Sequence, residues 1–518
     1  MPAELTRVFS AALRGVDALE VEIEVNETTS SEIQTTTVIV GLPDASVRES
    51  RDRVWTAIAN SGYPVLAGGR TTINLAPADL KKEGPSFDLP IAIAMIANRV
   101  DYEDRRQLDN YSIVGELALN GAVRPVKGIL SIALCARAAG REELIVPFEN
   151  AEEASVVEGI RVVGVRNLRD AFEHATGRAP LLPMPRKTLE DFLTETLWDI
   201  DFADVKGQQG VKRAIEVAVA GGHNILMVGP PGTGKSMLAR RISTIMPTMT
   251  EAEAVETTKI HSICGLLDSR HQFLVQRPYR SPHHTISDAG LLGGGSNPLP
   301  GEVSVAHNGV LFLDELPEFN RSTLEVMRQP LEDGKVTISR AAGSMTFPAR
   351  FMLVAAMNPC PCGYYGDPKR ECRCGTGNVL RYRQRISGPL LDRIDIHVEV
   401  PLVEFRELSK SDGGESSLLI RSRIEAARGI QQLRVRGSNA SCNTSLSPKQ
   451  MKEHCRIDEE SSMLLESTMS QMNFSARAYD RILRVARTIA DLAGAKDITA
   501  DHLLEAIGYR TLDRNLLG

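Results

Sequence analysis

The stretch NILMVGPPGTGKSMLARRI, residues 224–242, decides the fold of the chain. It holds the pattern G-x-x-x-x-G-K-S, which follows an apolar strand and opens a helix, a context typical of a phosphate-binding loop. Backbone N–H groups of such a loop surround a β-phosphate, and the helix N-terminus adds a favourable dipole. We expect Lys235 to reach the β- and γ-phosphates of ATP and Ser236 to ligate Mg²⁺. The predicted nucleotide-binding residues of the loop are Gly229, Pro230, Pro231, Gly232, Thr233, Gly234, Lys235 and Ser236.

Two further strands supply the polar groups that ATP hydrolysis needs. The apolar strand GVLFLDEL (309–316) ends in Asp314 and Glu315. We expect Asp314 to hold Mg²⁺ through water, and Glu315 to act as the base that activates the attacking water. Asn358 ends the strand FMLVAAMN and is expected to orient that water; capping the strand is its alternative role. The sequence therefore predicts an ATP hydrolase.

The composition predicts a large soluble protein. The 518 residues are 42% hydrophobic and 24% charged, which indicates several globular domains in one chain. The net charge of −6 gives no overall basic surface, so nucleic acid would have to bind at a local patch or in a pore. The N-terminal stretch is amphipathic, and no apolar run is long enough to span a membrane. With eight cysteines and no export signal, we expect a cytoplasmic protein with reduced thiols.

Sequence patterns divide the chain into four parts. Residues 1–175 mix strands, such as TTTVIVGLP, with helices, such as the apolar DLPIAIAMIA, and predict an α+β domain. Residues 176–200 begin with the proline-rich TGRAPLLPMPRK and are expected to form a linker. Residues 201–401 alternate strands and helices, which predicts an α/β core with a parallel sheet. Residues 402–518 are predicted to be helical, with the surface loop SKSDGGESS near their start.

Four cysteines follow Asn358 closely, in the two arms Cys360-x-Cys362 and Cys372-x-Cys374. The nine residues between the arms, GYYGDPKRE, favour a chain reversal, so both arms can converge on one metal. Four thiolates in a small loop suit tetrahedral Zn²⁺, although C-x-C arms are less diagnostic than C-x-x-C pairs. Unligated thiols, a redox pair and an iron–sulfur cluster are the alternatives. A bound metal would fix the conformation of the loop that follows Asn358. The remaining cysteines, Cys135, Cys264, Cys442 and Cys455, are expected to stay free.

The whole chain resembles the magnesium-chelatase-like AAA+ ATPases of the ComM/YifB family. The resemblance rests on the stretches DFADVKGQQGVKRAIEVAVAGGHN, GPPGTGKS, RPYRSPHHTISDAGLLGGG, LFLDELPEF, AAMNPCPCGYYGDP and SGPLLDRIDIHVEVP. It implies an AAA+ phosphate-loop core with a helical C-terminal lid, assembled into a ring that is usually a hexamer. Members of the ComM type are described as DNA helicases that promote branch migration during natural transformation. The resemblance thus implies an ATP-driven DNA motor that acts in recombination, with ATP and Mg²⁺ as cofactors.

The resemblance also implies roles for two arginines and for one loop. Arg393 in PLLDRID matches the arginine that related rings insert into the neighbouring subunit's ATP site; its alternative role is an ion pair with Asp392 or Asp395. Arg477 in SARAYDRIL matches the lid arginine that contacts the γ-phosphate; the alternative is a solvated helix face. Residues 204–208 resemble the segment that packs on the adenine.

The N-terminal part resembles the peptidase domain of Lon and the matching domain of the DNA-repair ATPase RadA. The carrying stretches are KKEGPSFDLPIAIAMI and GELALNGAVRPVKGIL. Ser86 falls on the Lon nucleophile, but Leu130 stands where Lon has its lysine base, and Lys127 lies three residues earlier. We therefore expect a non-proteolytic domain in which Ser86 caps a helix.

Three functions compete for this sequence: a DNA motor, a magnesium-chelatase-type ATPase that remodels a protein partner, and a Lon-like protease. The Lon-like domain favours the DNA motor over the chelatase, and the missing lysine argues against the protease. Two segments are candidates for DNA contact, the insert RPYRSPHH (277–284) and a β-hairpin predicted over 335–351. Arg277, Arg280, His283 and His284 are either DNA contacts or packing residues.

Overall fold

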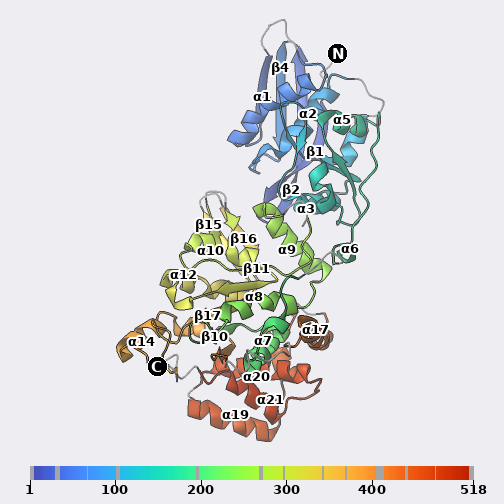
Figure 1. The fold of residues 1–518 in the computed structure, drawn as a ribbon. Helices are drawn as coiled ribbons and strands as arrows, with labels where there is room; N and C mark the ends of the chain where they lie inside the picture. The colour runs from blue at the N-terminus through green and yellow to red at the C-terminus, as the bar shows by residue number, and fades with distance from the viewer. Residues whose placement is uncertain are drawn as a thin grey trace. The chain divides into compact units, whose positions relative to one another are not determined.

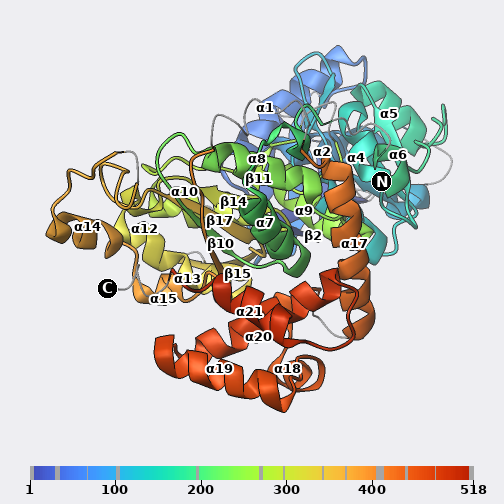
Figure 2. The ribbon, with the colours of Figure 1, turned by 60° about the horizontal axis from the view of Figure 1, so that its bottom comes forward.

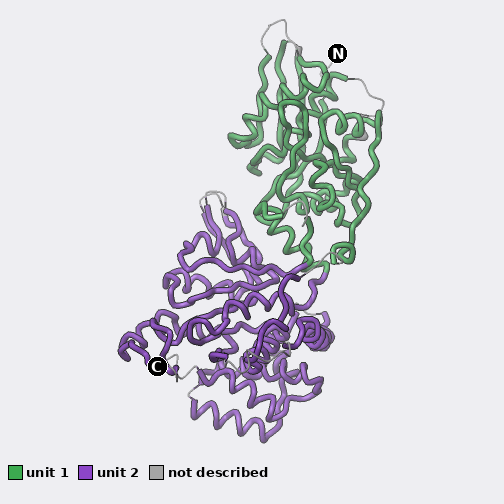
Figure 3. The backbone as a smooth tube through the Cα atoms, viewed as in Figure 1, with its two compact units in different colours: residues 1–195, 251–275 green, residues 196–250, 276–518 purple. Residues whose placement is uncertain are grey.

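The computed structural model divides into two compact units (Figure 3). Unit 1 comprises residues 1–195 and 251–275, and unit 2 comprises residues 196–250 and 276–518. The structure describes residues 5–29, 35–66, 68–100, 105–193, 198–267, 272–295, 298–340, 343–367, 370–403, 414–437, 441–472 and 474–512. Most of the predicted loop 409–417, and its start in particular, lies outside the described residues.

Unit 1 is built on a mixed seven-stranded sheet with the order β3-β4-β2-β1-β5-β8-β9 (Figure 1). Strand β2 runs antiparallel to its two neighbours, β1 and β4. Strands β1, β5, β8 and β9 run parallel to one another. Valine and isoleucine side chains alternate with glutamates along β2 and are fully buried, as the sequence predicts. The strands are β1 (Thr6–Arg14), β2 (Asp17–Thr29), β3 (Thr35–Val40), β4 (Gly69–Ala76), β5 (Tyr111–Ile113), β8 (Glu143–Pro147) and β9 (Arg161–Val165).

The helices of unit 1 include α2 (Asp88–Ala97), every residue of which is buried. This confirms the helix predicted from its continuous apolar run. Ser86 does not cap it: Phe87 is the N-cap residue, and neither α2 nor the short 3₁₀ turn before it has a side-chain cap. The expected capping role was therefore wrong, because Ser86 lies inside the turn rather than at its start. The other helices are α1 (Ala45–Asn60), α3 (Ile129–Ala138), α4 (Ala151–Ala154), α5 (Leu168–Ala175), α6 (Leu189–Leu193) and α9 (Glu251–Cys264), and a small hairpin joins β6 (Glu116–Leu117) to β7 (Val123–Arg124).

Helix α9 lies far along the chain from the rest of unit 1 but packs against α3. Ser262 on α9 donates a hydrogen bond to the Glu153 carboxylate (2.6 Å) and accepts one from the backbone N–H of Gly128 (2.9 Å). Glu153 is 5% exposed, and burial raises its pKa to about 7. A helix from the predicted ATPase region is thus part of the N-terminal unit.

Residues 177–188 of the predicted linker run along unit 1 as irregular chain, and the short helix α6 follows them. Leu181 donates its backbone N–H to His174 (2.9 Å), and Met184 donates its own to the carbonyl of Val162 (2.8 Å). Lys187 pairs with Glu152. These residues are therefore anchored to unit 1.

Unit 2 contains a five-stranded sheet in which every strand is parallel to its neighbours, with the order β11-β14-β17-β10-β18. The strands are β10 (Ile225–Val228), β11 (Tyr279–Arg280), β14 (Val310–Leu313), β17 (Met352–Met357) and β18 (Ile396–Glu399). This is the parallel sheet predicted from the alternating strands and helices, and its carboxyl edge gathers the loops that follow β10, β14 and β17. Core helices are α7 (Gln209–Gly221), α8 (Lys235–Ile245), α10 (Asp288–Leu292), α11 (Glu302–Val305), α12 (Arg321–Val326), α13 (Arg328–Asp333), α14 (Thr376–Arg383) and α15 (Gly388–Leu391), and β12 (Gly293–Gly294) pairs with β13 (Leu299–Pro300).

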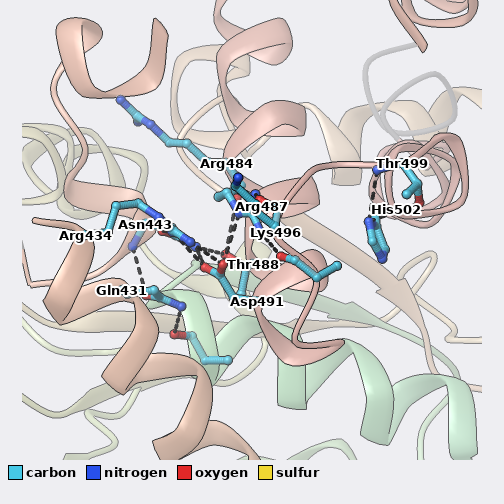
Figure 4. Close-up of polar contacts among 12 residues, drawn as sticks. Gln431, Arg434, Asn443, Arg484, Arg487, Thr488, Asp491, Lys496, Thr499 and His502 are labelled. Carbon is cyan, nitrogen blue, oxygen red and sulfur yellow. Dashed lines mark hydrogen bonds and ion pairs between the residues drawn. The ribbon is translucent and has the colours of Figure 1, made fainter. Parts of the chain in front are cut away.

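The C-terminal part of unit 2 is helical, and Figure 2 shows its helices grouped near α7, which α17 and α20 contact. The helices are α17 (Ser417–Arg434), α18 (Pro448–His454), α19 (Glu459–Met472), α20 (Ala476–Leu492) and α21 (Ala500–Gly508). Asp491 on α20 is buried and accepts hydrogen bonds from Arg434 (2.9 Å), Arg487 (3.0 Å) and Asn443 (2.8 Å) (Figure 4). Because these donors satisfy a buried carboxylate, removing any one of them would lower the stability of the folded protein.

Candidate nucleotide-binding site

The phosphate loop joins β10 to α8 as the sequence predicts. Helix α8 begins at Lys235, and Gly234 before it has a left-handed backbone conformation (φ 88°). Gly232 is also left-handed (φ 81°), which lets the loop curl without steric strain. The loop therefore presents backbone N–H groups at the start of a helix of 11 residues, an arrangement suited to phosphate.

Lys235 is held at the base of the loop. Its Nζ donates hydrogen bonds to the carbonyls of Gly229 (2.6 Å) and Pro230 (2.9 Å) and to Asn358 Oδ1 (3.2 Å). Burial lowers the pKa of Lys235, and the carboxylates of Asp314 and Glu315 oppose this shift. The structure thus brings together Lys235 and Asn358, which the sequence predicts in one site from separate motifs.

Ser236 and Asp314 face each other across the same site. Ser236 Oγ donates a hydrogen bond to Asp314 Oδ2 (2.7 Å). A hydroxyl and a carboxylate oxygen side by side are ligands that Mg²⁺ accepts, directly or through water. These residues therefore fit the predicted metal, which would offset phosphate charge when bound.

Glu315 follows Asp314 in a left-handed backbone conformation (φ 52°), and its N–H donates to Asp314 Oδ1 (3.0 Å). Its side chain is 54% exposed, so the carboxylate is accessible to water. His284 Nδ1 lies 3.7 Å from Glu315 Oε2. The sequence predicts DNA contact or packing for His284 and does not predict this pairing.

Arg277 and Arg280, from the same insert, are engaged within the chain. Arg280 makes a bidentate ion pair with Glu302 (2.7 Å for both contacts). Arg277 donates to the carbonyls of Pro247 (2.7 Å) and Asn308 (2.8 Å). Of the two roles considered for these arginines, the geometry favours packing.

Gln208 links the phosphate loop to the strand at the edge of the sheet. Its Nε2 donates to the carbonyls of Thr233 (2.9 Å) and Pro401 (3.0 Å). Beside it lies a cavity of about 390 Å³, whose lining includes Gln208, Val398 and Tyr509. Of the predicted adenine segment, Gln208 lines this cavity, whereas Asp204 pairs with Arg241 (2.8 Å).

Arg393 is 5% exposed and pairs with Glu332, not with Asp392 or Asp395. It lines a second cavity, also of about 390 Å³, together with Arg328 and Glu332. Burial lowers the pKa of Arg393; the Glu332 carboxylate opposes this shift, and the positive charge of Arg477 adds to it. Arg477 is exposed at the start of α20, and among the described residues neither arginine side chain forms a hydrogen bond or ion pair with the phosphate loop.

Asp395 has other partners than Arg393. Arg481 on α20 pairs with it (2.7 Å), and His223 Nδ1 lies 3.2 Å from its second oxygen. His223 Nε2 in turn lies 2.8 Å from the Thr488 hydroxyl. These contacts join the strand that follows Arg393 to the helical C-terminal part.

The four clustered cysteines converge. One Sγ from each lies within 4.8 Å of the others, and three Sγ–Sγ distances are 3.4, 3.6 and 3.6 Å. Tetrahedral Zn²⁺ with bonds of about 2.3 Å spaces its sulfurs by about 3.8 Å. The geometry therefore fits such a metal, and all eight cysteines of the chain are free of disulfides.

The predicted hairpin comprises β15 (Lys335–Arg340) and β16 (Gly343–Pro348), and it projects from unit 2 (Figure 1). One face packs inward. The other carries a ladder of exposed hydroxyls, in which Thr337 meets Thr346 (3.0 Å) and Ser339 meets Ser344 (3.2 Å).

Among the described residues, no helix combines the length and apolarity needed to cross a bilayer.

Three family profiles match successive parts of the chain. "Subunit ChlI of Mg-chelatase" matches residues 23–150, "Magnesium chelatase, subunit ChlI" matches residues 201–408, and "Magnesium chelatase, subunit ChlI C-terminal" matches residues 414–510. Lon protease 2 of Bacillus subtilis is 30% identical over 30% of this chain and 29% of its own length. With the sheets described above, these matches establish an AAA+ phosphate-loop core with a helical C-terminal part, preceded by a Lon-like α+β domain.

Several relatives match over nearly their whole length. The uncharacterized protein YifB of Escherichia coli is 44% identical over 99% of this chain and 98% of its own. The competence protein ComM of Haemophilus influenzae is 43% identical over the same shares. The chain therefore belongs to the magnesium-chelatase-like ComM/YifB family of AAA+ proteins.

Proposed function

We propose that the protein is an ATP-driven ring motor that moves or branch-migrates DNA in the cytoplasm, in recombination that includes natural transformation. The observation that carries this proposal is a split catalytic site. Lys235, Asp314, Glu315 and Asn358 meet at one edge of the sheet, whereas Arg393 is held elsewhere. A site that lacks its arginine within one chain is completed by a neighbouring copy.

Within one chain, the residues divide the work of hydrolysis. The loop amides and Lys235 bind the phosphates, and Ser236 and Asp314 hold Mg²⁺. Glu315 takes a proton from the attacking water, which Asn358 orients. The cavity beside Gln208 receives the adenine, because Gln208 contacts the phosphate loop directly.

The arginines imply a ring. Arg393 lines a cavity and Arg477 is exposed, and both supply positive charge to the ATP of the next subunit in the proposed assembly. Positive charge supplied in trans stabilises the transition state for phosphoryl transfer, often by about 10³-fold or more. We propose a homo-hexamer, in which six such interfaces form.

DNA is the proposed partner, and the β15–β16 hairpin its contact. Lys335 lies on the same exposed face as the row of hydroxyls, and Arg340, the last residue of β15, is exposed and lies on the opposite face. Hydroxyls and cations bind phosphate without reading sequence, which suits a motor that must pass over any base. The relative named as a competence protein supports a role connected with DNA.

We further propose that the four clustered cysteines bind one structural Zn²⁺ per chain. The spacing of their sulfurs supports a tetrahedral thiolate site. An iron–sulfur cluster or a redox role fits the same residues less well, because the sulfurs already lie at the spacing of a single ion.

The test is ATP hydrolysis with and without single-stranded, duplex and forked DNA. We expect DNA to raise turnover, and the double variant Lys335→Ala/Arg340→Ala to lose this stimulation while it keeps basal hydrolysis. A matched control changes Lys449 and Lys452, on helix α18, to alanine. Hydrolysis that no DNA affects would instead favour a magnesium-chelatase-type motor acting on a protein.

A further inference from the structure

The loop of clustered cysteines touches the phosphate loop directly. Gly363, one residue after Cys362, has a left-handed backbone conformation (φ 85°). A Cβ atom placed on it would lie 2.6 Å from Pro231 Cδ and 3.1 Å from Pro231 Cγ. Only a residue without a side chain allows this approach, and Pro231 is part of the phosphate loop.

The same segment reaches the phosphate loop at a second point. Asn358 Oδ1 accepts the hydrogen bond from Lys235 Nζ (3.2 Å). Between the two contacts, the carbonyl of Pro359 accepts from Arg383 Nε (3.1 Å), and the N–H of Gly363 donates to the carbonyl of Cys360 (3.0 Å). The stretch from Asn358 to Gly363 therefore lies against both Pro231 and Lys235.

The loop that follows Pro359 has few buried side chains to hold it in place. Among the described residues from 360 to 375, only Cys360 and Gly363 are buried. Tyr364 and Tyr365 are not buried and instead stack with Arg370 and Arg383. A small segment without an apolar core depends on a disulfide or a metal for a fixed shape. Cys360 and Cys362 lie within the contacting stretch, whereas Cys372 and Cys374 come from the returning arm.

We propose that the four-cysteine metal site is a clamp on the phosphate loop. Zinc joins the two arms, fixes Gly363 against Pro231 and Asn358 against Lys235, and so keeps the loop in the conformation that binds ATP. This inference rests on the proposed zinc site and on the proposed ATP site. It adds that loss of the metal lowers nucleotide affinity.

The first experiment compares zinc-loaded protein with protein stripped by a chelator and then dialysed. Zinc per chain is measured by elemental analysis, and binding of a non-hydrolysable ATP analogue by equilibrium titration with Mg²⁺. We expect about one zinc per chain, a Kd that rises about tenfold on stripping, and recovery on adding zinc alone. The double variant Cys372→Ser/Cys374→Ser should behave like stripped protein, with its folding checked by circular dichroism.

The second experiment tests the contact itself with two glycine variants. Gly363→Ala places a methyl group against Pro231. Gly366→Ala is the matched control: Gly366 has nearly the same backbone conformation (φ 79°), but nothing lies within 4 Å of its added Cβ. Both variants suffer the same backbone strain, so only displacement of Pro231 separates them. We expect both to keep their zinc, and only Gly363→Ala to bind the nucleotide more weakly.

The outcomes separate the proposals. Wild-type protein that binds no zinc would overturn the zinc site and the clamp together, while the ATP site stands. One zinc per chain with equal nucleotide affinity before and after stripping would overturn the clamp alone. Equal affinities of the Gly363→Ala and Gly366→Ala variants would do the same. Wild-type protein that binds no nucleotide would overturn the proposed ATPase.

Discussion

The imidazole of His284 lies beside the carboxylate of Glu315, with 3.7 Å between Nδ1 and Oε2. The ring of His283 lies tilted against that of His284, with 4.1 Å between the centroids, and the Phe319 ring meets His284 edge-on. His284 is thus held from two sides next to the proposed base. A base that is itself oriented by a third group is the usual arrangement in activated sites.

Replacing His284 should therefore change turnover rather than binding. We expect His284→Ala to lower kcat for ATP by about tenfold, with the KM for ATP unchanged. His284→Gln, which keeps a side-chain donor, should retain most of the activity, and His283→Ala serves as the control. Steady-state kinetics give both constants. Equal losses in the alanine and glutamine variants would mean that the histidine only supports the local fold.

Variants of the proposed base and of the phosphate-binding lysine should differ in their effects on ATP hydrolysis and ATP binding. Glu315→Gln removes the proposed base but leaves the loop intact, so ATP should bind normally while hydrolysis falls by at least about 100-fold. Lys235→Ala removes a phosphate contact and should weaken nucleotide binding itself. Titration and a phosphate-release assay distinguish the two variants. Near-normal hydrolysis by Glu315→Gln would show that another group is the base.

Arg393 should act across a subunit boundary. Mixing inactive Arg393→Ala protein with inactive Glu315→Gln protein should restore some hydrolysis, since mixed rings contain interfaces with both residues intact. Arg477→Ala should complement Glu315→Gln in the same way, because the Arg477 side chain is exposed at the start of α20. Subunit exchange is confirmed first by mass spectrometry. Mixtures no more active than their components would place both arginines in their own chain's site.

The stability of unit 1 should depend on pH through Glu153. Its pKa is raised from 4.5 to about 7 in the folded protein, mainly by burial. Below about pH 4.5 the carboxyl is protonated in both folded and unfolded chains, and its stabilising effect is complete. As pH rises towards 7 the unfolded chain releases the proton first, so up to about 3 kcal/mol is lost.

Hydrogen exchange of the α3 and α9 amides at pH 5 and pH 7.5 measures this loss. The Glu153→Gln variant, which cannot ionise, should show a smaller change in protection between these two pH values. Glu158→Gln alters an exposed carboxylate and is the control. Wild-type and Glu153→Gln proteins with the same pH dependence would contradict the assignment.

Local patterns were enough to predict much of the fold. The buried helix α2 and the strands β10, β14 and β17 follow from continuous apolar runs, and the phosphate loop from a motif with its flanks. The convergence of the cysteine arms followed from a short reversal, for which only local spacing matters. Each of these features depends on residues that lie close together in the sequence.

Contacts that depend on the sheet order could not be predicted in this way. His284 meets Glu315 because β11 pairs with β14, and no local pattern specifies that pairing. Gly363 meets Pro231 because β17 lies next to β10. The packing of α9 on α3 could not be predicted either, because the two helices lie far apart in the sequence.

The placement of α9 has a consequence for limited proteolysis. The chain passes between the two units at three places, near residues 195, 250 and 275. A cut near residue 195 would leave α9 covalently attached to the C-terminal fragment but docked on the N-terminal one, through Ser262 with Glu153 and through Lys259 with Asp17. The nicked protein should therefore travel as a two-fragment complex on a sizing column. Releasing the fragments from each other would require denaturant.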